Sequence, residues 1–243
     1  MINRTLYKGY FTKEDMSKWQ CPICNGSALK VVEEYFIKKN NSATHEYQPD
    51  IPEKIVSTFT ALLSCTNPQC KEVVTCSGTG FVEGYFNNCE TKYIEYFNPY
   101  FFYPPLNIFQ IPEKTPENVK ESILSSFSLI FTNKSSAANQ IRIALECLLT
   151  HLKVEQYPNQ GQKKRLSLHD RIKLLPKQYE YIRDICSAIK WLGNAGSHCD
   201  DRMTLDDVFD GYDMLSFVLE ELYDNKHPYV TKLAKKINAK RGV

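Results

Sequence analysis

Two pairs of cysteines in the first third of the chain have the spacing of a metal site. Cys21 and Cys24 form a Cys-Pro-Ile-Cys sequence, and Cys65 and Cys70 enclose four residues further along the chain. Two thiolates three positions apart can converge on one ion, because the turn after the first cysteine bends the chain back. A site of four thiolates around Zn²⁺ is tetrahedral and keeps no open position, so we expect one structural zinc ion per chain.

Other interpretations of these cysteines remain open. Cys76 or Cys89 could replace one ligand, because the gap of the second pair is longer than usual, and the thiols could also be ordinary reduced cysteines. Asn25 and Gly26 supply the turn residues that a metal-binding knuckle needs. A redox Cys-x-x-Cys is disfavoured because no strand–helix–strand pattern surrounds the first pair.

A second group of residues with chemical potential lies in the C-terminal half. Arg142 and Glu146 are four positions apart, which predicts an ion pair on one face of a helix. Asn194 and His198 lie in the sequence Gly-Asn-Ala-Gly-Ser-His, where Gly193 and its neighbour Asn194 favour the end of a helix. These two polar residues either form the turn structurally or take part in binding or catalysis.

Charge is segregated along this half of the chain. Residues 160–177 carry a net charge of +5, residues 226–243 carry +6, and residues 200–224 carry −8. These stretches are either solvated faces or surfaces for phosphates and for a basic partner. The candidate nucleic-acid-binding residues are Lys163, Lys164, Arg165, Arg171, Lys235 and Lys236.

Short β-favouring segments must position the cysteines. Segments rich in β-branched and aromatic residues predict strands at 29–37, 55–65, 72–86 and 91–97. Each cysteine pair then lies at the open end of a hairpin, as in a zinc ribbon. Residues 98–118 contain five prolines and predict an extended connector, because proline lacks the N–H that a central strand needs.

Apolar residues at helical spacing predict that the rest of the chain is helical. The first helix is expected to begin with Thr115 as N-cap and Pro116 at its first position, and to end near residue 132. Trp191 is expected to be a core residue. The other predicted helices are 135–154, 167–175, 179–192, 204–225 with Thr204 as cap, and one that begins at Pro228.

Composition excludes several classes of protein. The chain has 243 residues, of which 42% are hydrophobic and 24% charged, with a net charge of +2, so it is expected to be globular and not uniformly basic. No apolar run is long enough to span a membrane, and no apolar signal core is found near the N-terminus. Nine cysteines without an export signal favour the cytoplasm, where clustered thiols often bind metal.

The order of these motifs resembles a known family. An Arg-x-Ala-Leu-Glu helix, a Leu-x-x-x-Ile-x-x-Leu helix and a Gly-Asn-x-x-x-His end follow one another, after a Tyr-Pro-Pro stretch at residues 103–105. This order resembles the bacterial domain-of-unknown-function family 4145, which looks like a relative of the HEPN (higher eukaryotes and prokaryotes nucleotide-binding) helical bundles. The resemblance implies an α+β protein, with a β-rich zinc-ribbon module at residues 1–105 and an all-α HEPN-like bundle at 106–243.

The resemblance also limits what activity to expect. HEPN ribonucleases use an arginine shortly before a histidine to stabilise phosphate charge. Asn194 and His198 match the histidine end of that motif, but Gly193 occupies the arginine position. The leading prediction is therefore a non-catalytic zinc protein that binds nucleic acid or a protein partner in bacterial defence against foreign nucleic acid. The alternatives are a metal-independent endoribonuclease toxin that uses Asn194 and His198, and a structural adaptor. HEPN-like bundles often dimerise, so a homodimer through the bundle is a further expectation.

Overall fold

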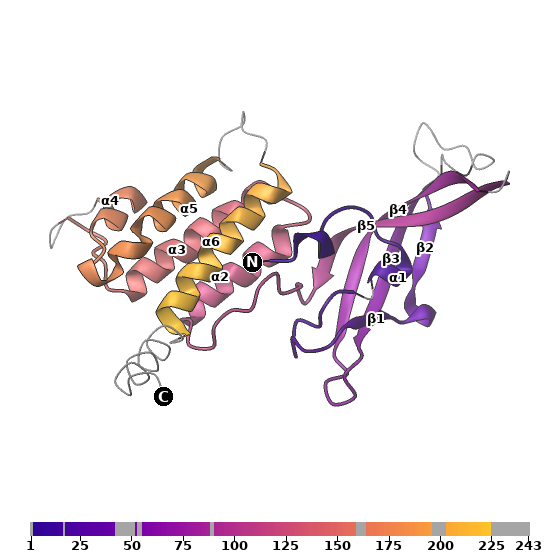
Figure 1. Cartoon of the computed structure of the whole chain (residues 1–243), viewed down its shortest axis with the longest axis horizontal. Coiled ribbons are helices and arrows are strands. Elements are labelled where there is room, and N and C mark those ends of the chain that lie inside the picture. Colours follow the sequence, from indigo (N-terminus) through magenta and orange to yellow (C-terminus); the bar gives the residue numbers. More distant parts are fainter. Residues whose placement is uncertain are drawn as a thin grey trace, which may run out of the picture. The chain divides into compact units, whose positions relative to one another are not determined.

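The chain forms two compact units, which are described separately (Figure 1). The sheet unit comprises residues 3–107 and 127–133, and the helical unit comprises residues 1–2, 108–126 and 134–243. The computed structural model describes residues 2–16, 18–41, 52, 55–87, 90–158, 164–195 and 203–224.

An antiparallel sheet is the framework of the first unit. Among the described residues, strand β3 pairs with β4 along one edge, β5 pairs with the far edge of β4, and β1 and β2 share the other edge of β3. The α+β class expected from the sequence is thus confirmed. The strands are β1 (Leu29–Val31), β2 (Ile37–Asn40), β3 (Val56–Cys65), β4 (Val73–Asn87) and β5 (Glu90–Tyr103).

The prediction of one strand at residues 29–37 is wrong, because a 3₁₀ turn at Glu33–Tyr35 separates β1 from β2. The turn allows Phe36 to lie against the core. Its ring stacks on Phe59 with centroids 5.7 Å apart, and meets Phe97 edge-on at 5.1 Å. Burial of this ring favours the interrupted strand over a continuous one.

The prediction of a connector from residue 98 is also wrong at its start, because β5 continues to Tyr103. β5 is an edge strand, where a proline costs no ladder hydrogen bond, and Pro99 lies beside a register shift between Ser77 and Gly78. Gly78 is required there, since a Cβ on it would lie 2.1 Å from the carbonyl oxygen of Asn98.

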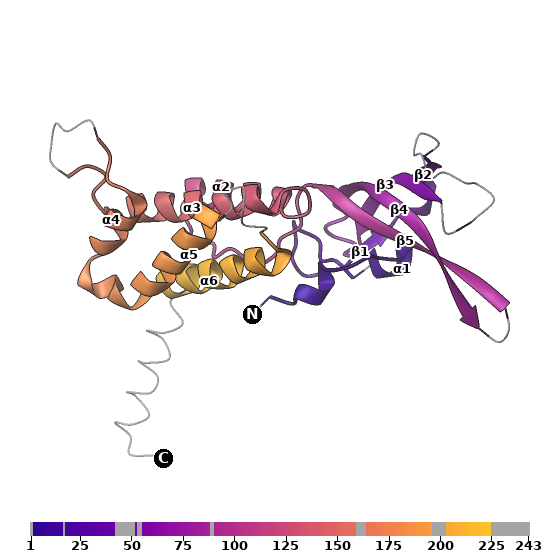
Figure 2. The same cartoon turned by 90° about the horizontal axis from the view of Figure 1, so that it is seen from above.

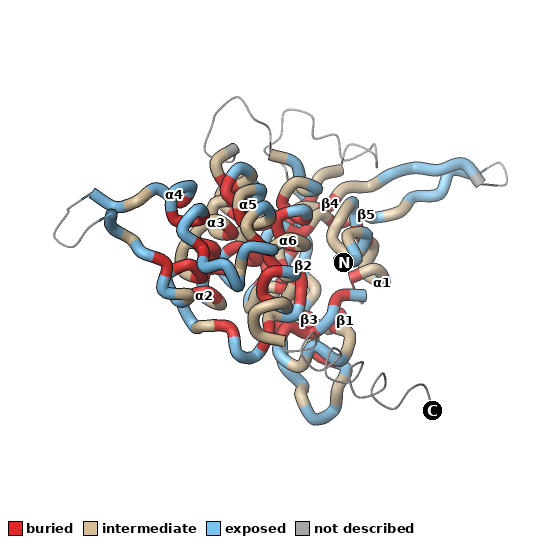
Figure 3. Tube along the Cα trace, turned by 60° about the vertical axis from the view of Figure 1, so that its left-hand side comes forward, coloured by how far each residue is buried: buried red, intermediate tan, exposed pale blue. Residues whose placement is uncertain are grey.

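Beyond Val56 and Phe81, the last pair formed with β3, the outer halves of β4 and β5 pair only with each other among the residues that the structure describes. Figure 2 shows them as a twisted ribbon that leaves the rest of the sheet, and Figure 3 shows its outer part as exposed or intermediate. Phe86, at 78% exposure, is the clearest sign that this ribbon adds little to the core.

Aromatic rings fill the core of the sheet unit. Trp19 lies between Phe11 and Phe102, with both pairs of ring centroids 5.0 Å apart. Met16, on the short helix α1 (Lys13–Met16), is fully buried in the same cluster. The N-terminal segment therefore belongs to the core that supports the cysteine pairs.

The helical unit is built around α3, α5 and α6, which pack on one another, while α4 packs mainly on α5. Figure 1 shows α2 alongside them. Buried side chains line the faces where these helices meet, as the apolar spacing predicts. The elements are α2 (Glu117–Leu129), α3 (Lys134–His151), α4 (Leu168–Lys173), the 3₁₀ helix η4 (Lys177–Ile182), α5 (Arg183–Ala195) and α6 (Leu205–Tyr223).

Helix starts follow the sequence signals in two cases and depart from them in a third. Thr204 caps α6 and forms a reciprocal capping box with Asp207, as predicted. Ser167 caps α4 through the backbone N–H of Asp170. The Thr115 hydroxyl, by contrast, is buried without a hydrogen-bond partner and does not cap α2. The helix predicted after Pro228 lies outside the described residues.

None of the described helices combines the length and the apolarity that crossing a membrane requires.

Candidate metal centre and polar helix face

The four predicted cysteines come together in one cluster. All four sulfur atoms lie within 4.8 Å of one another, with 3.9 Å between Cys21 and Cys70 and 3.6 Å between Cys24 and Cys65. Thiolates at the corners of a tetrahedron around Zn²⁺ would be about 3.8 Å apart, given a Zn–S distance of about 2.3 Å. The cluster could therefore hold a metal ion such as zinc.

The first pair lies in a small hairpin that begins at Trp19 and ends at Leu29. The N–H of Cys21 donates to Ser27 O at 2.8 Å, and the N–H of Asn25 donates to Cys21 O at 2.9 Å. Asn25 has φ of +50°, so the left-handed residue of the knuckle is Asn25 itself, directly after Cys24.

The second pair lies where β3 turns into β4, and its backbone repeats the first. The N–H of Cys65 donates to Glu72 O at 2.8 Å and closes the turn. Lys71, directly after Cys70, has φ of +52°. Asn67 stabilises the longer gap, because its side-chain oxygen accepts from the N–H of Gln69 at 3.0 Å.

Backbone N–H groups point at the sulfur atoms. The N–H of Asn67 donates to Cys65 Sγ at 3.4 Å. The backbone of Gly26 lowers the pKa of Cys24 to about 7, whereas burial raises the pKa of Cys65 to about 12. Four adjacent thiols cannot all ionise without a cation, and N–H donors favour the thiolates that a metal requires.

Asn107 supports the first knuckle from a segment that follows β5. Its side-chain N–H₂ donates to Pro22 O at 2.7 Å and to Asn25 Oδ1 at 2.8 Å. Asn107 O in turn accepts from the Tyr7 hydroxyl at 3.3 Å. Sequence reasoning missed Asn107, because an isolated asparagine in a proline-rich segment carries no pattern.

Of the two alternative ligands, Cys76 does not join the cluster. Cys76 is fully buried in β4 within the apolar core, and burial raises the pKa of its thiol. Cys89 lies outside the described residues. The ligand set favoured by the sequence is thus the set that the structure brings together.

The polar residues of the helical unit lie where α3 meets α5. Arg142 forms the predicted ion pair with Glu146, and its Nε donates to Asn139 Oδ1 at 3.1 Å. A Cβ on Gly193 would lie 2.5 Å from Arg142 Cβ. Gly193 therefore permits close packing of two helices.

The expectation that Gly193 and Asn194 form a break after the helix is wrong, since α5 continues through Ala195. Gly193 lies inside the last turn of α5, where its lack of a side chain lets the helix pack closely on Arg142 of α3. His198 lies outside the described residues.

Arg171 is not available to a nucleic acid, contrary to expectation. It is 6% exposed, and its guanidinium donates to the carbonyls of Glu146 at 3.2 Å, Val154 at 3.4 Å and Glu155 at 3.3 Å, and to Thr150 Oγ1 at 2.9 Å. It thus satisfies carbonyl groups at and beyond the C-terminal end of α3.

Of the other predicted nucleic-acid-binding residues, two are exposed and three lie outside the described residues. Lys164 and Arg165 are exposed, and Arg165 Nε donates to the Tyr157 hydroxyl at 3.2 Å. Lys163, Lys235 and Lys236 lie outside the described residues.

Trp191 is exposed, and the expectation that it is a core residue is wrong. Its neighbour Lys190 is the buried one of the two, and Lys190 Nζ lies 3.6 Å from the indole centroid and 3.4 Å from His169 Nδ1. Ile182, Ile185 and Ile189 recur at helical spacing on the side opposite to Trp191, so its position off this apolar stripe was the sequence signal for its exposure.

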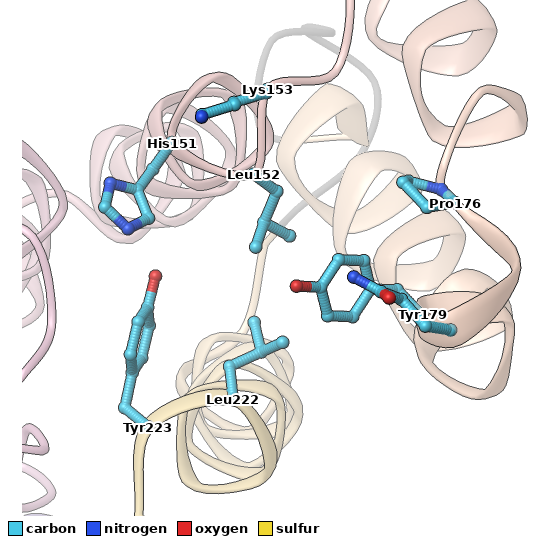
Figure 4. Close-up of a pocket in the computed structure, with 8 residues that line it drawn as sticks. His151, Leu152, Lys153, Pro176, Tyr179, Leu222 and Tyr223 are labelled. Atoms are coloured by element: carbon cyan, nitrogen blue, oxygen red, sulfur yellow. The ribbon is translucent and has the colours of Figure 1, made fainter.

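A pocket of about 340 Å³ lies between the ends of α3 and α6 and the start of η4 (Figure 4). The Tyr223 hydroxyl points toward the His151 ring, whose centroid is 6.1 Å from that of the tyrosine, and it is buried without a hydrogen-bond partner. Burial raises the pKa of Tyr223 to about 12. The residues that line the pocket are His151, Leu152, Lys153, Pro176, Gln178, Tyr179, Leu222 and Tyr223.

The fold and the cluster define a class: an α+β protein with a four-cysteine antiparallel sheet followed by a helical region. Residues 9–102 match the family described as Domain of unknown function (DUF8608), and residues 125–240 match Domain of unknown function (DUF4145). The resemblance of the helical half to family 4145 is thereby confirmed, and its relation to HEPN bundles stays a prediction. No curated protein and no solved structure matched the chain.

Proposed function

We propose that this is a zinc-stabilised nucleic-acid-binding protein without catalytic activity. The observation that carries the first part is the convergence of four thiols within 4.8 Å. Four thiolates fill the coordination of zinc, so no position is left for water or substrate. Such a site stabilises the fold, and its binding free energy contributes to folding.

The binding role is inferred from charge on the helical unit. Lys164, Lys173 and Lys177 are exposed on and beside α4, and Arg165 is exposed between Tyr157 and the start of that helix. These cations are near one another in sequence, around one short helix. Phosphate groups are the ligands that such a cluster attracts at low salt.

The endoribonuclease remains the competing function. Arg142 lies against Gly193, the position where a catalytic arginine would be expected from the family resemblance. Its guanidinium, however, is held by Glu146 and Asn139. An arginine committed to an internal ion pair is poorly placed to stabilise phosphate charge, so we favour binding without cleavage.

Within this proposal the protein acts in the cytoplasm, where reduced thiols persist, and contributes to bacterial defence against foreign nucleic acid. The family resemblance is the support for the defence role. The proposal also includes that the sheet unit is related to zinc ribbons and that the helical unit is a HEPN-like bundle. The protein would form a homodimer through that bundle. The structural adaptor is the outcome if no nucleic acid is bound.

Metal analysis tests the zinc site. Protein purified under reducing conditions should contain about one zinc ion per chain, and the Cys65→Ser variant should lose it. Cys147→Ser is the matched control, because Cys147 lies on α3, far from the cluster in sequence. A stoichiometric metal content that survives Cys65→Ser would contradict the assignment.

Binding assays at low salt test the second part, with labelled single-stranded RNA, single-stranded DNA and duplex DNA. Lys164, Lys173 and Lys177 are replaced together by glutamine. The slope of the logarithm of the binding constant against the logarithm of the salt concentration should then fall by about two to three, roughly one for each lost phosphate contact. The control replaces three exposed lysines of the sheet unit, Lys30, Lys39 and Lys92. Cleavage that is lost in His198→Ala would establish the ribonuclease instead, and absence of binding would leave the adaptor.

A further inference from the structure

A buried ammonium and an exposed indole are adjacent on α5. Lys190 is only 4% exposed, whereas Trp191 is 64% exposed. Lys190 Nζ lies 3.6 Å from the indole centroid and 3.4 Å from Nδ1 of His169, which is exposed on α4. The buried ammonium therefore lies beneath two exposed side chains, Trp191 on α5 and His169 on α4.

The ammonium lacks an anionic partner. Within the described part of the chain, Lys190 contacts an aromatic face and an imidazole but no carboxylate. The carboxylate of Glu146, on α3, forms an ion pair with Arg142 and does not serve as the counter-charge of Lys190. A buried charge is costly unless a counter-charge is present, so this group is better suited to an anion than to being left alone.

The indole adds a second recognition element. An exposed tryptophan next to a cation offers a flat surface for a nucleobase, and stacking on such a surface does not depend strongly on base identity. In a duplex, the bases are stacked on each other and their faces are not accessible. A phosphate at the exposed His169, next to the charge of Lys190, and a base on the indole together describe one nucleotide of a single strand.

We propose that Lys190, His169 and Trp191 form a subsite for one nucleotide of single-stranded nucleic acid. His169 contacts the phosphate, the buried Lys190 adds its positive charge from beneath, and Trp191 stacks on the base. The subsite rests on the proposed function and narrows its substrate class to single strands. RNA and DNA share this chemistry, so both are used as probes.

Zinc-loaded full-length protein is titrated with labelled oligouridylate, with oligothymidylate and with a duplex of the same length. Trp191→Ala should weaken binding of both single strands by about ten-fold to one-hundred-fold. Trp191→Phe should retain most of the affinity, because phenylalanine keeps a stacking face. Phe217→Ala is the control, since it removes another exposed aromatic ring, on α6.

Lys190→Met separates a binding role from a structural one. Methionine keeps the apolar stem and removes the uncompensated charge, so the melting temperature should stay equal or rise while single-strand affinity falls at least about five-fold. A variant that loses both stability and affinity would assign Lys190 a structural role and contradict the subsite.

The outcomes distinguish this inference from the broader proposal. If the protein binds single strands and duplex equally, and Trp191→Ala changes neither, the subsite is wrong while nucleic-acid binding stands. If the unmodified protein binds no probe at low salt, the proposed function fails first.

Discussion

At the scale of single residues, the cysteine cluster depends on groups that hold the backbone around it. Asn25 and Lys71 adopt left-handed conformations directly after the second cysteine of each pair. Each knuckle thus turns its N–H groups toward sulfur, and Asn107 fixes the first knuckle from outside. Metal sites are tuned by such surrounding hydrogen bonds as well as by the ligands themselves.

Replacing Asn107 by aspartate should weaken the site. The aspartate keeps the size of the side chain but cannot donate to Pro22 O and Asn25 Oδ1, so about 1–3 kcal/mol of stability should be lost. Competition with a zinc indicator should show weaker metal binding. The control is Asn98→Asp, because the Asn98 side chain on β5 donates to the exposed Tyr100 hydroxyl. Equal behaviour of the two variants would argue against a supporting role for Asn107.

Stability of the helical unit should fall at alkaline pH. Burial raises the pKa of Cys186 from 9.0 to about 12. Between these values the unfolded chain releases the proton and the folded protein keeps it, so stability is full below pH 9 and falls as pH rises, by up to about 1.4 kcal/mol per pH unit.

Denaturant unfolding followed by helical circular dichroism measures this dependence. Cys186→Ala should flatten the slope above pH 9, with Cys147→Ala as a control that removes a half-buried thiol of the same size. An unchanged slope in Cys186→Ala would show that the thiol does not report on folding in this pH range.

At the scale of elements, a close helix contact and a buried guanidinium position the helices around the apolar core of the helical unit. Gly193 lets the backbone of α5 approach Arg142 on α3. Arg171, on the short helix α4, satisfies carbonyls at and beyond the end of α3. The motifs around residues 142, 171 and 193 therefore position helices, independently of any role in chemistry.

Gly193→Ala should destabilise the helical unit by about 1–3 kcal/mol, although alanine favours a helix, because its Cβ would lie 2.5 Å from Arg142 Cβ. Gly211→Ala on α6 is the matched control. Its Cβ would meet only the ends of Ile141 and Leu192, at 3.0 Å and 3.1 Å. Thermal unfolding should show a clearly larger loss for Gly193→Ala, and equal losses would contradict the packing role.

At the scale of the whole molecule, each unit has its own source of stability and its own tryptophan. The sheet unit contains the cysteine cluster and the buried Trp19, while the helical unit contains Trp191 and an apolar core. The two tryptophans of the chain thus report on different units.

Removal of zinc with a chelator should unfold the sheet unit and leave most helical structure in place, since metal binding supplies folding energy only where the ligands lie. In the Trp191→Phe variant, the emission of Trp19 should shift to longer wavelength on chelation, while helical circular dichroism changes little. Re-addition of zinc should reverse the shift. Simultaneous loss of both signals would show that the units do not unfold independently.

The cysteine ligands could be predicted because each pair is local. Two thiols three or five positions apart meet through a single turn, whatever the rest of the chain does, and β3 ends at Cys65 as the strand pattern predicts. Helices α3 to α6 were found for the same reason, since apolar spacing and caps such as Thr204 act within one segment.

Only the tertiary structure decided which charged side chains are buried and which distant segments they contact. The burial of Arg171 depends on where α4 meets the end of α3, and the burial of Lys190 depends on where α5 meets His169 on α4. Asn107 reaches Pro22 across 85 positions of the chain. The sequence by itself determined the local turns and the two cysteine pairs, because short-range geometry fixes them. The two pairs meet in one cluster because β1 pairs with β3, which is a long-range contact. The orientation of the polar face came from long-range packing, which no local pattern encodes.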